Sequence, residues 1–172
     1  MAKDTLKPSE WEDKDLKTSE HDDIMIRFAN IEVWNKIFKT KFGEYPLLDP
    51  RSMAEPSRVP KFKDLRVEEI KLEHPILVEE KSSYTKKLLV GFIDILLRGR
   101  MGLGDFQYTQ EIGCEIKAKE NNLGAAIRQV KRYKFYSGIG AWIVISPWDY
   151  WNDILAPQFI YWLPTDIERI VE

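Results

Sequence analysis

The sequence predicts an α/β protein built from a β-sheet and flanking helices. Short segments rich in apolar and β-branched residues, separated by turn signals, fill residues 76–119. A segment with helical periodicity follows at 121–138, and a second apolar run comes directly after it at 141–148. With a helix expected before the first strand, the order is helix, three strands, helix, strand.

The composition is that of one globular unit. A chain of 172 residues is long enough for one domain with a full core and too short for two ordinary ones, so we expect a single domain over 1–172. No apolar run approaches the roughly 20 residues that span a bilayer. The charged N-terminal segment has no signal-like apolar stretch, which predicts a cytoplasmic, intracellular protein without membrane contact.

The single cysteine and the net charge restrict the chemistry further. Cys114 alone excludes an intrachain disulfide and a metal site built on several thiolates of one chain, and we interpret it as a small buried side chain. A net charge of -2 gives no global attraction to nucleic acid. Any contact with nucleic acid therefore requires a local basic patch.

The first third of the chain is expected to hold an arm, a helix and a loop. Residues 1–17 mix charged residues and proline without periodicity, which predicts a mobile arm. Ser19 suits a helix N-cap, and Ile24, Phe28, Ile31 and Phe38 recur at helical spacing, so one helix is expected to run to about residue 39. Residues 42–64 carry four prolines and no sustained pattern, which predicts a connecting loop with a short helical turn.

The rest of the chain is predicted to form the sheet and its second helix. Strands are expected at 76–81, 86–100 and 110–119; the second is apolar on both faces, as in a central strand. A glycine-rich turn at 99–105 leads into the third. In 121–138 the apolar residues lie on one helical face and Gly138 suits the C-terminal stop. The runs 141–148 and 158–164 are read as further strands.

Asp94 is the first candidate for chemistry. It interrupts an apolar strand, on which we place it on one face with Val90, Phe92 and Leu96. An ionised carboxylate there is costly unless a cation compensates it. Opposed residues of an antiparallel pair have a constant index sum, so Asp94 opposite Glu115 would put the turn centre at about 104.5, within the glycine-rich turn.

The third strand supplies an acid and two bases. Its core positions alternate with polar ones, the latter including Glu115, Lys117 and Lys119. Two carboxylates that share a spot repel unless a divalent cation holds them, and oxygen ligands suit Mg²⁺ or Mn²⁺. Such a site supports hydrolysis, because the metal lowers the pKa of a bound water and a lysine orients or deprotonates the attacking water.

The runs "GFID", "CEIK" and "RQVKRY" resemble the D, ExK and QxxxY motifs of PD-(D/E)xK nucleases, particularly the RecB-like exonuclease branch. The resemblance covers residues from about 76 to 147. It implies a restriction-endonuclease-like core, with a mixed central sheet flanked by helices in the order α-β-β-β-α-β. Ile93 stands where the namesake motif has proline, and a single cysteine cannot hold the iron-sulfur cluster that some RecB-like proteins carry.

The resemblance also implies roles for individual residues. Asp94, Glu115 and the backbone carbonyl of Ile116 would bind the metal, and Lys117 would be catalytic. The helix that supports the site and touches DNA would carry Gln129 and Tyr133. Family members also use an acid or a histidine near the first helix or first strand, for which the candidates are Glu20, His21, Glu79 and Glu80. Asp105 competes with Asp94 as the first acid, but its glycine-rich turn favours a turn role.

Basic and aromatic residues suggest further contacts. The helix after the motif carries Arg128, Lys131, Arg132 and Lys134, which with Lys117 and Lys119 would attract DNA phosphates without reading sequence. For Trp148, Tyr150 and Trp151, packing in the core or an interface is favoured over base stacking, and an exposed part of this segment would suit a homodimer contact.

The function predicted from these features is that of a Mg²⁺- or Mn²⁺-dependent nuclease. It would hydrolyse phosphodiester bonds of DNA in repair, recombination or the biology of a mobile element or virus, with specificity for structure more than for sequence. The alternative is a catalytically silent protein that binds nucleic acid or supports an assembly and keeps the nuclease fold.

Overall fold

The computed structural model describes residues 18–55, 59–80, 86–103, 105–119 and 122–171. The N-terminal segment 1–17, for which a mobile conformation is expected, lies outside these residues. The helices are α1 (Ser19–Arg27), α2 (Ile31–Thr40), α3 (Leu123–Ser137), α4 (Trp151–Leu155) and α5 (Glu168–Val171). The strands are β1 (Leu65–Glu80), β2 (Lys86–Leu103), β3 (Phe106–Ile116), β4 (Ala141–Ile145) and β5 (Ile160–Leu163).

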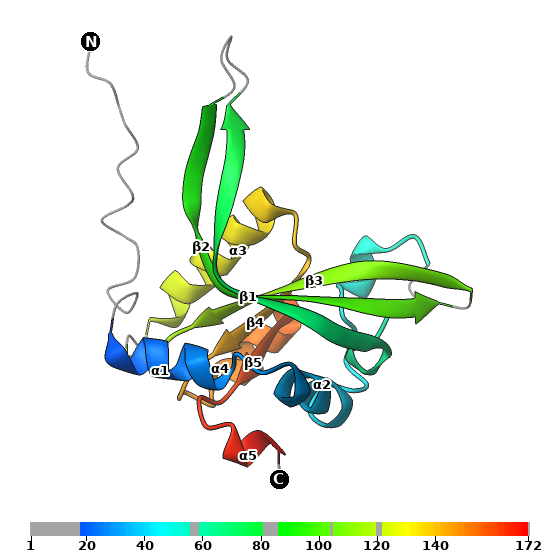
Figure 1. Ribbon diagram of the computed structural model, residues 1–172, viewed down its shortest axis with the longest axis horizontal. Coiled ribbons are helices and arrows are strands. Elements are labelled where there is room, and N and C mark those ends of the chain that lie inside the picture. The colour runs from blue at the N-terminus through cyan, green and yellow to red at the C-terminus, as the bar shows by residue number, and fades with distance from the viewer. Residues whose placement is uncertain (1–17, 56–58, 81–85, 104, 120–121, 172) are drawn as a thin grey trace.

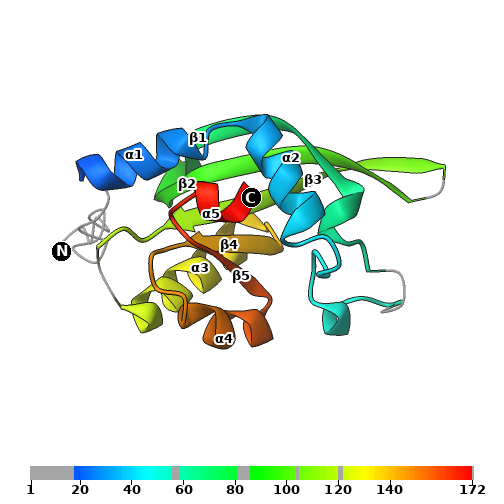
Figure 2. The ribbon, with the colours of Figure 1, turned by 90° about the horizontal axis from the view of Figure 1, so that it is seen from below.

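The strands form one five-stranded mixed sheet in the order β1-β2-β3-β4-β5. The pairs β1–β2 and β2–β3 are antiparallel, whereas β3–β4 and β4–β5 are parallel. Helices α1 and α2 cover one face of the sheet, and α3 and α4 cover the other (Figures 1 and 2). The expected α/β class, with a mixed sheet flanked by helices, is therefore confirmed. None of the helices in the described part of the chain is long and apolar enough to cross a membrane.

Each face of the sheet has its own hydrophobic core. On the α1/α2 face, Trp34 and Phe38 pack with Phe28 and Phe62 against the side chains of β2, β3 and β4. On the α3 face, the buried stripe of the helix packs against Trp142 and Trp151. Burial of large apolar side chains on both faces stabilises the sheet and makes its inner strands apolar on both sides.

Strand β2 forks away from β3 halfway along its length. It pairs with β1 from Lys86 to Met101, but with β3 only from Ile95 to Leu103. The part of β2 before Ile95 and the facing part of β1 leave the sheet as a two-stranded arm, which rises from the body in Figure 1. The β2–β3 register, with Ile95 opposite Cys114, has the index sum predicted for Asp94 and Glu115, so the expected turn centre is correct.

The helix expected from Ser19 to residue 39 is wrong as one element, because the chain forms two helices there. Thr18, not Ser19, caps α1, its side chain accepting a hydrogen bond from the His21 amide at 3.2 Å. Asn30 breaks the run: its side chain accepts hydrogen bonds from the amides of Glu32 and Val33 and starts α2. Because the apolar spacing continues across Asn30, the sequence pattern does not indicate the break between α1 and α2.

Several boundaries also differ from expectation. β1 begins at Leu65 rather than Ile76, because its first part is an edge strand that mixes charged and apolar residues and reads as a loop. β2 continues to Leu103 and β3 begins at Phe106, so residues 99–103 of the predicted glycine-rich turn belong to strand β2. The expected strands around β4 and β5 and the helical turns within 42–64 are present, whereas the short helix α4 was not predicted.

Candidate active site

Asp94 lies at the point where β2 leaves β3. Its side chain is 1% exposed. Its Oδ2 accepts a hydrogen bond of 2.7 Å from the Ile116 amide. Because β2 pairs with β3 only as far as Cys114, the carboxylate takes the place of a strand partner for that amide. Where β2 separates from β3, the Ile116 amide requires another acceptor, and its hydrogen bond to Asp94 fixes the position of that carboxylate.

The strand does not alternate evenly around Asp94, which corrects the expectation that Val90 and Leu96 share its face. Val90 and Leu96 belong to the core on the α3 side, whereas the Asp94 carboxylate contacts His21 of α1. A bulge in the β1–β2 pairing between Ile76 and Leu77 leaves Val90 without an opposed residue and interrupts the alternation of faces there.

His21 of α1 is the charged neighbour of Asp94. Its Nε2 lies 3.3 Å from Asp94 Oδ1, and its Nδ1 lies 3.3 Å from Asp22 Oδ1. Burial by itself lowers the pKa of His21, but the contact with Asp94, helped by Asp22 and the charge of Glu115, outweighs burial and raises that pKa to about 9. An imidazolium thus compensates the buried carboxylate of Asp94.

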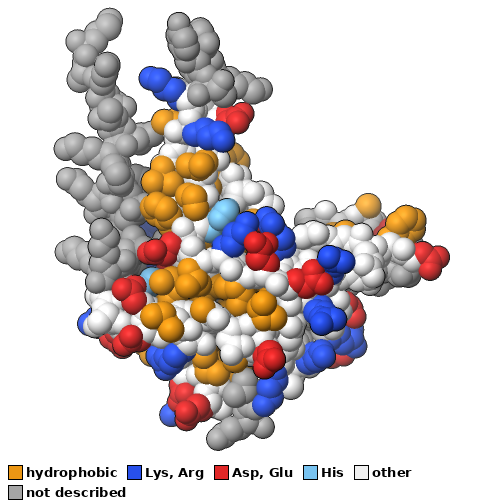
Figure 3. All heavy atoms as spheres, viewed as in Figure 1, with side chains coloured by type: hydrophobic (Ala, Val, Ile, Leu, Met, Phe, Trp, Pro, Cys, Tyr) orange, Lys and Arg blue, Asp and Glu red, His pale blue; other side chains and the backbone are white. Residues whose placement is uncertain are grey.

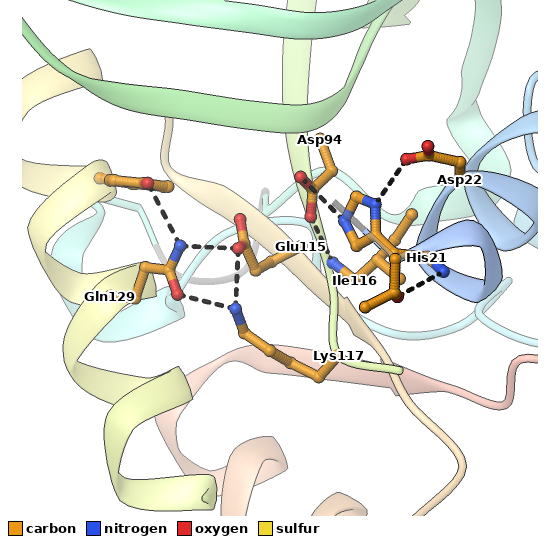
Figure 4. A network of polar contacts seen from close by, with 9 residues as sticks. His21, Asp22, Asp94, Glu115, Ile116, Lys117 and Gln129 are labelled. Carbon is orange, nitrogen blue, oxygen red and sulfur yellow. Dashed lines mark hydrogen bonds and ion pairs between the residues drawn. The ribbon is translucent and has the colours of Figure 1, made fainter. Parts of the chain in front are cut away.

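Glu115, Lys117 and Gln129 form a closed network on the α3 side of the fork (Figure 4). Lys117 Nζ donates to Glu115 Oε1 at 3.0 Å and to Gln129 Oε1 at 2.8 Å. Gln129 Nε2 donates to the same Glu115 oxygen at 2.7 Å and to the Tyr133 hydroxyl at 3.2 Å. Glu115 and Lys117 are almost fully buried, so the geometry of this network decides whether their burial is tolerated.

Two glycines make room for the aromatic side chains behind the site. A Cβ at Gly91 would lie 2.4 Å from the Tyr133 hydroxyl, and a Cβ at Gly113 would lie 2.6 Å from the ring of Trp142. The glycine of "GFID" therefore leaves room for Tyr133 of α3, and the glycine of "IGCEIK" leaves room for Trp142 of the neighbouring strand β4.

The two acids influence the same neighbours. The charges of Asp94 and Glu115 both raise the pKa of His21. Burial, and after it the same two charges, raises the pKa of the Cys114 thiol. Cys114 is fully buried, which confirms the interpretation of it as a core side chain. The two carboxylates therefore lie within electrostatic reach of one small region.

The donor set of this region is suited to a hard divalent cation. Two carboxylates and the Ile116 carbonyl offer oxygen atoms, and Mg²⁺ is commonly held by one or two carboxylates together with waters and substrate phosphates. His21 Nε2 is a buried nitrogen beside Asp94 without a well-formed hydrogen bond to the described residues, and it could bind a cation only as part of a neutral imidazole. The described residues contain no group of three or more His, Cys, Asp or Glu side chains arranged around one metal position.

The structure separates the four candidates for an additional ligand. Glu20 lies on the surface, 3.7 Å from Lys119. Glu79 is exposed near the tip of the arm, and the side chain of Glu80 lies outside the described residues. Only His21 reaches Asp94 among the three described ones. A signal for it was available, because His21 shares its helical spacing with the buried Ile24 and Phe28.

The basic residues predicted to contact DNA differ in their burial and in their contacts. Arg128 and Lys131 are exposed on α3, one helical turn apart. Arg132 is half-buried; it donates to the Val90 carbonyl and lies over the ring of Tyr133. Lys119 remains exposed, whereas Lys117 is buried within the network of Glu115 and Gln129. The exposed members are those available for phosphate contacts.

The remaining candidates behave as ordinary structural residues. Trp148 stacks on the buried Trp151, with ring centroids 4.9 Å apart, as expected for core packing. Tyr150 is 49% exposed. Asp105 is exposed in the β2–β3 turn, far along the hairpin from the fork.

Comparisons with known proteins do not assign this chain: no family model, no curated protein and no solved structure matches it. The resemblance to PD-(D/E)xK motifs therefore stays a prediction.

Proposed function

We propose that this protein is a Mg²⁺- or Mn²⁺-dependent nuclease that hydrolyses phosphodiester bonds of DNA. The observation that carries the proposal is the convergence of buried Asp94 with the Glu115–Lys117 pair where two strands separate. Buried acids and bases brought together at a break in a sheet are typical of functional sites. We further propose that the sheet and its helices form a restriction-endonuclease-like core of the RecB-like type.

The metal would be held by Asp94, Glu115 and the Ile116 carbonyl, with His21 Nε2 as a nitrogen ligand once the imidazolium has lost its proton. When bound, such an ion stabilises negative charge on the phosphate and makes a water more acidic. His21 and Lys117 compensate the carboxylates while no ion is held. A bound cation would replace part of that compensation.

Lys117 is the residue for proton handling and charge stabilisation. Its Nζ is fixed between Glu115 and Gln129, so the ammonium has one defined position beside the acids. Gln129 is a positioning residue: it holds Glu115 and Lys117 at once and is itself held by the Tyr133 hydroxyl. Fixed donors of this kind stabilise a developing negative charge without reorganisation.

DNA would be drawn to the site by the exposed cations nearest to it. Lys119 follows the catalytic strand, and Arg128 and Lys131 stand on the outer face of α3, the helix that carries Gln129. Such side chains contact phosphates and orient the duplex, and they carry no sequence information. We therefore propose specificity for DNA structure.

The second candidate function is a catalytically silent protein that binds nucleic acid or supports an assembly. The observation that favours it is the internal charge balance of the site, in which Lys117 contacts Glu115 and His21 contacts Asp94. A cluster balanced in this way is compatible with a folded core in the absence of metal.

A panel of labelled linear, nicked, flapped and four-way DNA substrates, with Mg²⁺, Mn²⁺ or EDTA, tests the proposal. We expect metal-dependent cleavage of at least one substrate, and a loss of at least about a hundredfold in rate for Asp94→Asn and for Lys117→Ala. Asp105→Asn is the matched acid control, because Asp105 is exposed in the β2–β3 turn, and it should cleave at the wild-type rate.

Thermal unfolding of each variant shows whether it is folded, and calorimetry with Mn²⁺ measures binding apart from turnover. Cleavage that persists undiminished in Asp94→Asn and Lys117→Ala contradicts the site. Binding to DNA without cleavage of any substrate, in either metal, selects the silent alternative.

A further inference from the structure

The arm formed by β1 and β2 exposes large apolar side chains. Leu77 and Leu89 are each 49% exposed, and Phe92 is 38% exposed. In Figure 3, which has the view of Figure 1, hydrophobic side chains gather along the arm, with basic and acidic ones toward its tip. A ribbon of two strands is at best marginally stable in water, so apolar residues on its open face call for a partner surface.

The register places Leu77, Leu89 and Phe92 on one face of the arm and Leu88 on the other. Residues opposite each other on paired strands point to the same side, and so do residues two positions along. The outer face of the arm is defined by three cross-strand pairs, Pro75–Phe92, Leu77–Leu89 and Glu79–Lys87. The bulge at Val90 keeps Leu89 and Phe92 on this same side.

The opposite face of the arm is covered near the body. Ile76 is 3% exposed and packs, together with Val90, in the core beneath α3. The Arg132 side chain adds a hydrogen bond from α3 to the Val90 carbonyl. Near the body, one face of the arm therefore packs against α3, and the outer face is exposed.

We propose that two copies of this chain associate through the outer face of the arm. The arms would stack face to face about a two-fold axis parallel to the arm, with both tips at the same end. A rotation of this kind places β1 of each copy over β2 of the other. Leu77 then lies over Leu89, and Glu79 lies over Lys87 of the second copy.

The outer face of the arm is complementary to itself, which favours a second copy of this chain as its partner. In the stacked arms, Glu79 of each copy lies over Lys87 of the other, and Leu77 lies over Leu89. Residues paired across one arm have the same position along it, and rotation about an axis parallel to the arm does not change that position. DNA is a poorer occupant, since the face carries one acid for each base and phosphates require a surplus of Lys and Arg. This interface differs from the aromatic segment 146–164, in which the sequence predicts a homodimer contact.

Sedimentation over a range of protein concentrations tests the interface with two matched leucines. We expect a reversible dimer of the wild-type chain, and at least about a tenfold rise in the dimer dissociation constant for Leu89→Ser. Leu88→Ser is the control, because Leu88 is 42% exposed on the other face of the same arm, and it should dimerise as the wild type does.

A charge-swap experiment tests the pairing itself. Glu79→Lys and Lys87→Glu should each weaken their own homodimer at least about tenfold, because like charges then face each other twice. An equal mixture of the two variants should associate again. In the mixed dimer the introduced lysine of one copy would face the introduced glutamate of the other, and the second contact would be the native pair of Glu79 with Lys87.

A monomeric wild type at every concentration overturns the proposal, and so does an equal effect of the two leucine substitutions. Failure of the mixture to associate overturns the stacked arrangement. DNA cleavage is not part of any of these measurements, so their outcome is separate from that of the nuclease proposal.

Discussion

The two halves of β2 are similar in sequence and different in environment. The inner half, from Ile95 to Leu103, pairs with β3 throughout and with β1 as far as Met101, and its Ile95, Leu96 and Leu97 are buried. The outer half, from Lys86 to Asp94, pairs only with β1, and its Leu88, Leu89 and Phe92 are 38–49% exposed. Apolar composition therefore indicates a strand, whereas the neighbours of the strand determine what is buried.

The boundary between the two halves is where the polar side chains converge. Main-chain groups of β3 beyond Cys114 face no described strand on that side, and Asp94 supplies an acceptor to one of them. A buried charge is tolerated there because α1 and α3 bring His21 and Gln129 to the same place. The site is thus a consequence of the fork in the sheet.

The sharpest test of the comparison is the removal of one leucine from each half. Leu97→Ala deletes a fully buried side chain from the core on the α1/α2 face, and we expect a loss of about 2–5 kcal/mol in the free energy of unfolding. Leu88→Ala, on the arm, should change it by less than about 1 kcal/mol. Urea denaturation measures both. Equal losses would mean that the arm is packed as tightly as the body.

A glycine on each half provides the second test. Gly91→Ala introduces a Cβ 2.4 Å from the Tyr133 hydroxyl, so we expect a loss of about 1–3 kcal/mol from the displacement of Tyr133 and α3. A Cβ at Gly102 would meet nothing within 4 Å, and Gly102→Ala should stay within about 0.5 kcal/mol of the wild type. Thermal unfolding compares the two. A neutral Gly91→Ala would show that Tyr133 is not held against β2.

The features predicted correctly from sequence are those that depend on local pattern. The stripe of α3, the stop at Gly138 and the β2–β3 register follow from periodicity and spacing. The fork does not, because the residues on both sides of Asp94 are equally apolar. His21 was one of four candidates, and only the packing of α1 against the sheet distinguishes it from Glu20 beside it.

The mistaken elements have physical reasons of the same kind. The break at Asn30 depends on a side-chain cap that competes with continued helix, and apolar spacing does not report it. The first part of β1 carries charges because one of its edges faces no other strand of the described sheet; it is held there by Asn35 of α2, which exchanges two hydrogen bonds with the main chain of Val67. Edge strands with such composition resemble loops in a single sequence.

The smallest expected effect concerns the charges that join the strands of the inner half. Arg98 Nη2 lies 2.7 Å from Glu111 Oε1 on β3, and its Nη1 lies 3.1 Å from Glu69 Oε2 on β1, so this residue links three strands. Its side chain is 40% exposed, and solvent screens such pairs. We expect Arg98→Gln to lower the free energy of unfolding by about 1 kcal/mol or less.

The salt dependence of that loss separates charge from packing. If ion pairing is the cause, the difference between Arg98→Gln and the wild type should shrink between low salt and about 1 M NaCl, where the Debye length falls to about 3 Å. Arg100→Gln is the control, since Arg100 has one partner, Glu68 at 3.0 Å, among the described residues and is 62% exposed. A loss for Arg98→Gln that does not change with salt would instead assign the stabilisation to the aliphatic part of Arg98 lying across the sheet.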